Sequence, residues 1–184
     1  MIRGRSLGAA WAVVATAWAC GEDPARGLSV SAYGALALSA DGNTMYAATA
    51  DDGTIARIDL TDGRTASIRV GGEPTRLVRI DNRILATLRA ERSVLELIDD
   101  GRTLVPGRTV EVGAEPVGIT ASRDGRFVYV AASVSDQVIE LNSESLEPSR
   151  VWSFPHEPRW LVGTPDDGVL YVASAWRGLL SRID

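Results

Sequence analysis

The residues of this 184-residue chain whose spacing could do chemistry are three glutamates, each followed by proline: Glu73, Glu115 and Glu157, which stand 42 residues apart. Carboxylate oxygens are the ligands that hard cations such as calcium prefer. Glutamates at equivalent positions of a repeat could therefore form a ring of rim carboxylates. The simpler interpretation is a polar residue before proline in a tight turn, copied when the repeat was duplicated. We favour that interpretation.

A second candidate site is the segment that follows the third repeat. His156, Arg159 and Trp160 lie close together in the sequence, and Trp176 follows in the next repeat. A cluster of aromatic and cationic side chains could bind a sugar, an aromatic compound or an anion. The alternative is that the tryptophans pack between sheets and that His156 is a solvent-exposed turn residue.

Several kinds of site are excluded by the residue inventory. His156 is the only histidine and Cys20 is the only cysteine, which rules out a zinc site of the usual ligands. No glycine-rich phosphate loop follows a strand and opens a helix. The formal charge of −5 and the absence of a basic stripe argue against a nucleic-acid partner. We therefore predict no catalytic residue, no metal and no cofactor.

The elements that position these residues repeat with the same period of about 40 residues, which indicates a repeat architecture. Each repeat has four short segments of strand-like alternation, with Asp-Gly turns between them. The polar residues that end strands, Asp59, Asp99, Asn142 and Asp184, are predicted to bond local backbone. The sequence predicts an all-β β-propeller of four-stranded antiparallel blades, with about four repeats over residues 27–184: 32–73, 74–115, 116–157 and an incomplete 158–184.

The second and fourth repeats depart from the pattern. The second has Asp81-Asn82 where the others have an Asp-Gly turn, and its segment 99–108 is predicted to be a longer surface loop because it contains Pro106-Gly107. The fourth lacks a final strand, for which residues 27–31 could substitute, since propellers avoid unpaired edges. Two arrangements stay open, a closed four-bladed ring and a partial arc of a larger propeller.

The third repeat carries Val112-Gly-Ala-Glu-Pro116, Ser122-Arg-Asp-Gly125, Tyr129-Val-Ala131 and Val138-Ile-Glu-Leu-Asn142. These motifs resemble the YVTN-type β-propeller repeat of bacterial and archaeal surface proteins, and the resemblance covers nearly all of residues 28–184. It implies a propeller fold and leaves the reaction open. Members of that family usually have about seven blades, so this chain is short for the family.

The N-terminus reads as an export signal. Two arginines precede a 13-residue apolar stretch, residues 7–19, which is too short to span a membrane but suits a signal peptide. Cys20 follows directly. The segment Ala17-Trp-Ala-Cys20 fits an ordinary cleavage site and also resembles a bacterial lipobox, with Ala17 in place of leucine. We favour a lipidated Cys20, a signal peptide over residues 1–19 and a tether over residues 20–26.

These observations lead to three functional hypotheses. The leading one is an exported, envelope-associated binding or scaffold protein, periplasmic or at the cell surface, which is anchored through Cys20 and binds an envelope protein or a small ligand. The runner-up is a lactonase-like or quinoprotein-like enzyme or ligand sensor that uses the segment from His156 through Arg159 to Trp160. The third is a truncated propeller that associates with itself to complete a ring.

Replacement of Cys20 by serine tests the lipid anchor. We expect the wild-type chain to incorporate a palmitate analogue and the Cys20→Ser chain to incorporate none, because only the thiol can carry the lipid. Fluorescence of the labelled protein after electrophoresis measures the difference. Equal absence of label from both chains would instead support ordinary cleavage after Ala19.

Overall fold

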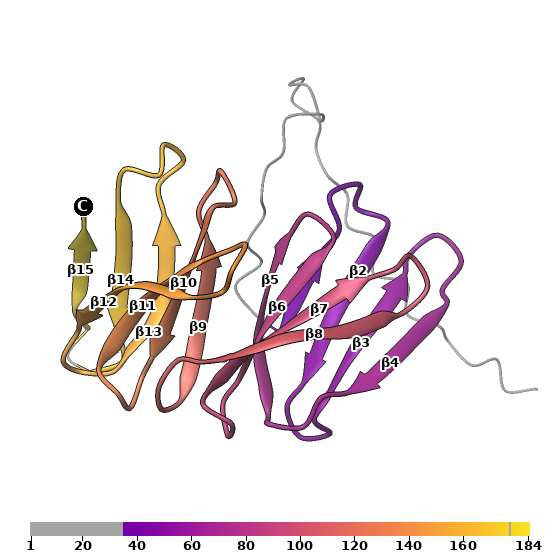
Figure 1. Ribbon diagram of the computed structural model, residues 1–184, viewed down its shortest axis with the longest axis horizontal. Coiled ribbons are helices and arrows are strands. Elements are labelled where there is room, and N and C mark those ends of the chain that lie inside the picture. The colour runs from indigo at the N-terminus through magenta and orange to yellow at the C-terminus, as the bar shows by residue number, and fades with distance from the viewer. Residues whose placement is uncertain (1–34, 177) are drawn as a thin grey trace, which may run out of the picture.

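The computed structural model describes residues 35–176 and 178–184, which form four antiparallel sheets in a row (Figure 1). The first blade contains β1 (Leu36–Leu38), β2 (Thr44–Thr49), β3 (Thr54–Asp59) and β4 (Thr65–Arg69), and the second contains β5 (Pro74–Ile80), β6 (Arg83–Leu88), β7 (Ser93–Asp99) and β8 (Leu104–Glu111). The third contains β9 (Pro116–Ala121), β10 (Phe127–Ala132), β11 (Gln137–Asn142) and β12 (Pro148–Ser153), and the fourth contains β13 (Pro158–Gly163), β14 (Leu170–Ser174) and β15 (Leu180–Ile183).

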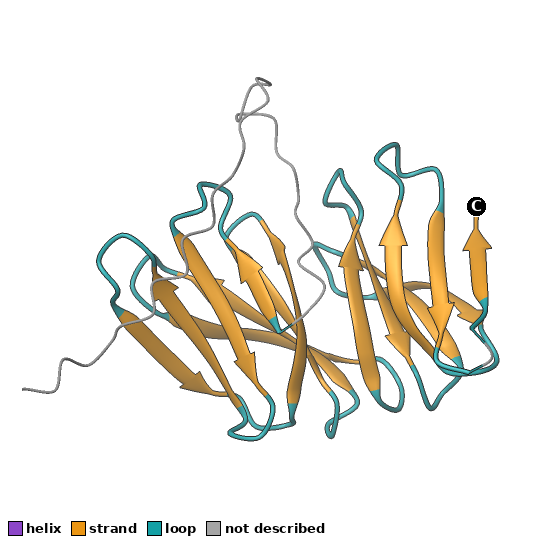
Figure 2. Cartoon of the chain, turned by 180° about the vertical axis from the view of Figure 1, so that it is seen from behind, coloured by secondary structure: helices purple, strands orange, loops and turns teal. Residues whose placement is uncertain are grey.

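All-β architecture and four-stranded blades are confirmed, and the described residues contain strands and loops but no helix (Figure 2). Among residues 35–176 and 178–184 there is thus no helix of a length and apolarity that would let it cross a membrane.

Turn chemistry explains the hairpins. Gly42 and Gly125 have φ of 72° and 71°, in the left-handed region that glycine enters without strain. The preceding Asp41 and Asp124 accept backbone N–H groups across the same turns.

The prediction of a surface loop around Pro106-Gly107 is wrong. Both residues lie within β8, and Pro106 pairs with Leu97 next to a β-bulge. Proline is tolerated there because β8 is the outermost strand of its sheet, so the missing N–H leaves no neighbouring strand unpaired. Gly107 is required by close packing, since a Cβ at this position would lie 2.7 Å from the Glu96 carboxylate. Tertiary contacts therefore overrode the local turn signal.

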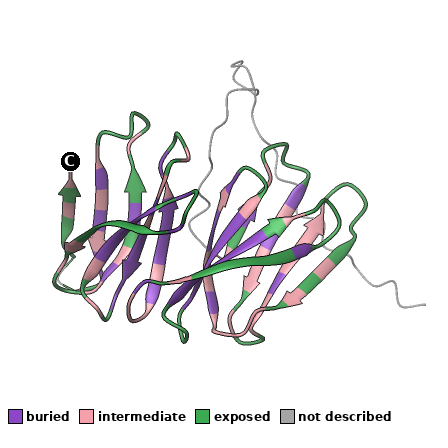
Figure 3. Ribbon diagram, in the orientation of Figure 1, coloured by how far each residue is buried: buried purple, intermediate pink, exposed green. Residues whose placement is uncertain are grey.

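Three apolar clusters hold the blades together, one at each junction between consecutive blades. The first joins Ile55 to Leu77, the second joins Val78 to Ile119, and the third joins Val138 to Leu161 (Figure 3). Each middle blade thus buries both faces of its sheet. Burial on both faces explains the long apolar runs of β6 and β10, which depart from simple alternation.

The four described blades form an open arc, with the first and fourth blades at opposite ends of the row (Figure 1). The principal contacts between blades join consecutive ones only, through β5 with β1 and β2, β9 with β5 and β6, and β13 with β9 and β10. The described blades are therefore not arranged as a closed four-bladed ring. The closing strand predicted over residues 27–31, like Cys20 and the signal peptide, lies outside the described residues.

Gly118 marks the tightest approach between two blades. A Cβ on Gly118 would lie 2.3 Å from the carbonyl oxygen of Arg159 in the next blade. We expect Gly118→Ala to lower the free energy of unfolding by about 1–3 kcal/mol, because the strands must separate to admit the methyl group. Urea denaturation measures the change. Gly163→Ala is the matched control, since a Cβ there meets no atom within 4 Å. Equal stability of both variants would show that the junction yields easily.

Candidate functional site

The three glutamates that precede proline share one backbone conformation. Their φ angles are 53°, 51° and 57° for Glu73, Glu115 and Glu157, in the left-handed region that residues with a Cβ seldom occupy. Each carbonyl oxygen accepts the backbone N–H of the residue that follows the second strand of its blade, from Arg89, Ser133 and Ala175 at 3.1, 2.9 and 2.9 Å. The interpretation of these glutamates as turn residues thus has a structural basis.

The side chains of these glutamates are not gathered into a metal site. Glu73 pairs with Arg89 (Nη2 to Oε2, 2.6 Å), and Glu157 pairs with Arg159 (Nη2 to Oε2, 3.3 Å). Within the described residues, no group of three or more histidine, cysteine, aspartate or glutamate side chains is placed to hold a metal ion. Arginines therefore neutralise two of the three carboxylates that the sequence suggested as a ring.

The second predicted cluster is spread over a corner of the fourth blade. His156 is exposed in the turn before β13, with φ of 82°, and Trp160 and Trp176 are both exposed. Trp160 and Trp176 therefore do not pack between blades, whereas Trp152, which precedes His156 in the same segment, is partly buried at the junction of the third and fourth blades. Arg159 is half-buried, and its Nε is enclosed with no hydrogen-bond acceptor. None of the four predicted residues, His156, Arg159, Trp160 and Trp176, lines any of the three cavities described below.

Asp99, which the sequence predicted only as a turn residue, joins the first blade to the second. Tyr46 donates its hydroxyl to Asp99 Oδ2 at 2.5 Å, and Arg57 Nε lies 3.0 Å from both oxygens of Asp99. Burial and the contact with Asp99 raise the pKa of Tyr46, so its hydroxyl stays a donor. Asp99 also accepts the N–H of Gly101, as the prediction of a turn residue required. Its main partners nevertheless lie on another blade.

A second ionic cluster lies within the second blade and contacts the third. Glu96 is buried and accepts Nε of Arg108 at 3.0 Å and Nη1 of Arg83 at 3.2 Å. Hydrogen bonding from Arg108 holds the pKa of Glu96 below its usual range despite burial. Arg83 Nη1 also donates to the carbonyl of Ser143 in the third blade at 2.7 Å. One guanidinium therefore connects a buried carboxylate to the neighbouring sheet.

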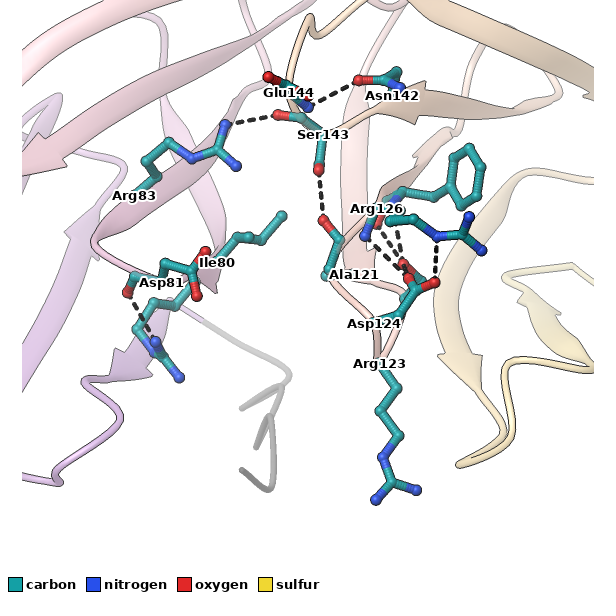
Figure 4. A pocket seen from close by; sticks show the side chains of 14 residues that line it. Ile80, Asp81, Arg83, Ala121, Arg123, Asp124, Arg126, Asn142, Ser143 and Glu144 are labelled. Atoms are coloured by element: carbon teal, nitrogen blue, oxygen red, sulfur yellow. Dashed lines mark hydrogen bonds and ion pairs between the residues drawn. The ribbon is translucent and has the colours of Figure 1, made fainter. Parts of the chain in front are cut away.

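The largest described cavity, about 570 Å³, lies between the second and third blades beside this contact. Its walls come from the first hairpin of each blade and from the loop after β11, and Figure 4 shows Arg83 reaching across to Ser143. The hairpin of the second blade has only Asp81 and Asn82 between β5 and β6. The corresponding turns of the other blades are longer, with at least five residues between their strands.

Turn length explains why the cavity opens here. At the next junction, the longer turn of the fourth blade reaches the third, where Asp167 accepts the N–H groups of Arg123 and Asp124 at 2.7 and 3.1 Å. Among the described hydrogen bonds, none joins the two-residue turn of the second blade to the third blade. The departure at Asp81-Asn82, which looked like a weak copy of the repeat, is thus the feature that leaves room for a ligand.

The cavity is lined by charges of both signs: Arg79, Arg83, Arg123, Arg126, Asp81, Asp124 and Glu144. Arg126 pairs with Asp124, whose pKa is lowered to about 2, chiefly by the backbone N–H of Arg126 and then by the Ser122 hydroxyl. Arg79 donates to two backbone carbonyls, those of Leu38 and of Asp81, and among the described residues has no carboxylate within ion-pair distance. Its guanidinium is fixed in place with its charge uncompensated.

Two smaller cavities lie elsewhere among the described residues. A space of about 200 Å³ between the third and fourth blades contains Tyr129 and Trp152, whose ring centroids are 6.5 Å apart, above the buried Glu140. Burial, followed by the charge of Glu140, raises the pKa of Tyr129 to about 12. A third cavity at the outer side of the first two blades is lined by polar residues around Arg57 and Arg102.

Comparison with known proteins supports the fold. No protein-family model and no curated protein sequence matches the chain. Among solved structures it is similar to hydrazine synthase of Kuenenia stuttgartiensis, with a TM-score of 0.74 and 19% identity over 81% of this chain and 45% of that chain. It is also similar to the Cps50 (Swd1) beta-propeller domain of Myceliophteria thermophila, with a TM-score of 0.65 and 14% identity over 80% and 49%.

A third similar structure is a putative 6-phosphogluconolactonase from Bacteroides fragilis, with a TM-score of 0.68 and 17% identity over 81% of this chain and 52% of that chain. The described chain has the β-propeller fold. At this level of identity the similarity establishes the fold alone. The chain spans about half the length of the solved structures that it matches.

The contact between the first two blades gives a direct test of the ionic network. We expect Asp99→Ala to lower the free energy of unfolding by about 3–5 kcal/mol, because Arg57 would be left as an unpaired buried charge. Asp62→Ala is the matched control. Its pair with Arg64 is exposed, with 43% and 88% of the side chains accessible, so the loss should be at most about 1 kcal/mol. Chemical denaturation measures both, and equal losses would contradict the structural role of Asp99.

Proposed function

We propose that this protein is an exported β-propeller of the YVTN-repeat type that acts as a binding or scaffold protein at the cell envelope. The observation that carries the proposal is the cavity between the second and third blades. The short hairpin of the second blade leaves room for this cavity. Its lining contains arginine side chains, which donate hydrogen bonds, and carboxylates, which accept them. Export and the lipid anchor are supported by the sequence around Cys20.

The walls of the cavity suit recognition of a polar partner. Asp81 and Glu144 are exposed, and no described hydrogen bond or ion pair uses their carboxylates, while the Arg79 guanidinium is held in place by two carbonyls. Of the other charges around the cavity, Arg126 pairs with Asp124 and Arg83 pairs with Glu96, while Arg123 donates to the carbonyl of Pro165. Fixed and unpaired charges of both signs are what a polar small molecule or a polar loop of an envelope protein would need in order to bind specifically.

The alternative is a propeller enzyme, which the similarity to a putative 6-phosphogluconolactonase raises. Its predicted residues, His156 and Arg159, lie away from the three described cavities. The described cavities therefore support a binding role better than they support catalysis at His156 and Arg159.

Charge reversal at the cavity tests the binding role. Purified protein would be used to capture partners from envelope extract, and native mass spectrometry would identify the complex before its Kd is measured. We expect Asp81→Arg and Glu144→Arg each to weaken binding by roughly tenfold or more, which is about 1.4 kcal/mol. Asp51→Arg is the matched control, because Asp51 is exposed in the loop between β2 and β3, away from the cavity.

Two results would contradict the proposal. One is that the Asp81→Arg and Glu144→Arg variants bind with the same Kd as the Asp51→Arg control. The other is turnover of a lactone substrate by the purified protein that His156→Ala abolishes, since this would favour the enzyme.

A further inference from the structure

The burial of equivalent residues differs sharply between the middle and the ends of the arc. Ile55, Val94 and Val138 occupy the same register position in the third strands of the first three blades, opposite Ala48, Thr87 and Ala131, and each has 0% of its surface exposed. Each faces the blade that follows it. Leu180 is the equivalent residue of the fourth blade, opposite Ala173, and it is 68% exposed.

The other end of the arc shows the complementary pattern. Leu77, Ile119 and Leu161 occupy equivalent positions in the first strands of the last three blades and face the blade that precedes them, with 3%, 7% and 1% of their surface exposed. Leu36 is the equivalent residue of the first blade, and it is 47% exposed. Among the described residues, the outer face of the first blade therefore has no blade packed against it, although it is a copy of the surface that every later blade buries.

Neighbouring residues extend both uncovered faces. Trp160 and Val162 lie on β13 and are nearly half exposed, on the side of the fourth blade that carries Leu180. Leu38 is also exposed on β1, two residues from Leu36 and on the same side of the strand. Two exposed apolar patches of this kind on one protein mark interaction surfaces.

We propose that the outer face of the fourth blade binds the outer face of the first blade in a second copy of this chain. The two faces are the two halves of one kind of junction, the kind that already occurs three times within the chain. A contact between copies would therefore repeat a packing that the sequence demonstrably forms. This surface is distinct from the cavity between the second and third blades.

The asymmetry of the contact limits how the copies can assemble. The two faces differ, so the contact is head to tail, and such contacts form rings when the rotation closes. Two copies related by a twofold axis would make two identical junctions and leave no uncovered face.

Sedimentation velocity tests the proposal with the chain that carries Cys20→Ser, so that no lipid is attached. We expect a mass of twice the chain, with dissociation on dilution as mass action requires. Leu36→Asp and Leu180→Asp should each reduce the mass to that of a single chain, because each removes one half of both junctions. Val134→Asp is the matched control: Val134 is 60% exposed but lies in the loop between β10 and β11, and this variant should keep the doubled mass.

A mixture of the two variants distinguishes head-to-tail contact from pairing of like faces. Leu36→Asp keeps an intact fourth-blade face, and Leu180→Asp keeps an intact first-blade face. An equimolar mixture should therefore recover a dimer with one junction, while each variant alone stays single. Far-UV circular dichroism establishes that both variants fold.

Three results would overturn the proposal. The first is a single-chain mass for the Cys20→Ser protein at every concentration, which would mean that something other than a second copy covers the faces. The second is a dimer that persists in Leu36→Asp alone, which would indicate pairing of like faces. The third is that the Val134→Asp control dissociates to single chains as completely as Leu36→Asp and Leu180→Asp do. Each readout is independent of ligand binding at Asp81, so failure here leaves the proposed function untouched.

Discussion

Packing of one sheet face against the next is the interaction on which the rest of this structure depends. The sheets are small, and a four-stranded blade is stable only when its apolar faces are covered. Each junction therefore buries equivalent residues, Ile55, Val94 and Val138 among them. Close packing of the sheets also explains why Gly118 lacks a side chain where two strands approach. The outer faces of the end blades carry equivalent apolar residues, but no described blade packs against them.

Polar contacts fix the blades within this apolar frame. Buried ion pairs contribute modestly to stability, because desolvation opposes the attraction, but removal of one partner is costly. Asp99 and Glu96 therefore serve to set the relation of one blade to the next more than to add stability. The two carboxylates use different partners, so the junctions are alike in their apolar residues and differ in their charged ones.

In a repeat protein, a binding site can arise at a junction whose turns and charged residues differ from those of the other junctions. At the second junction, loss of turn residues around Asp81 opens a cavity beside the contact between Arg83 and Ser143. At the third, a longer turn covers the equivalent region through Asp167. In this repeat scaffold the cavity thus lies where one turn is shorter than its equivalents, while the apolar junctions bury equivalent residues.

The sequence by itself determined the fold class, the repeat period and most strand positions, because alternation, Asp-Gly turns and the Glu-Pro corners are local signals that recur. It failed at Pro106-Gly107, and it identified Asp99 only as a turn residue, because the pairing of β8 and the hydrogen bond from Tyr46 to Asp99 depend on residues of another strand or blade. It also could not reveal the cavity, the pairing of Glu73 with Arg89 or the exposure of Leu180. Only the tertiary structure decided these, since they depend on which surfaces meet when the blades are stacked.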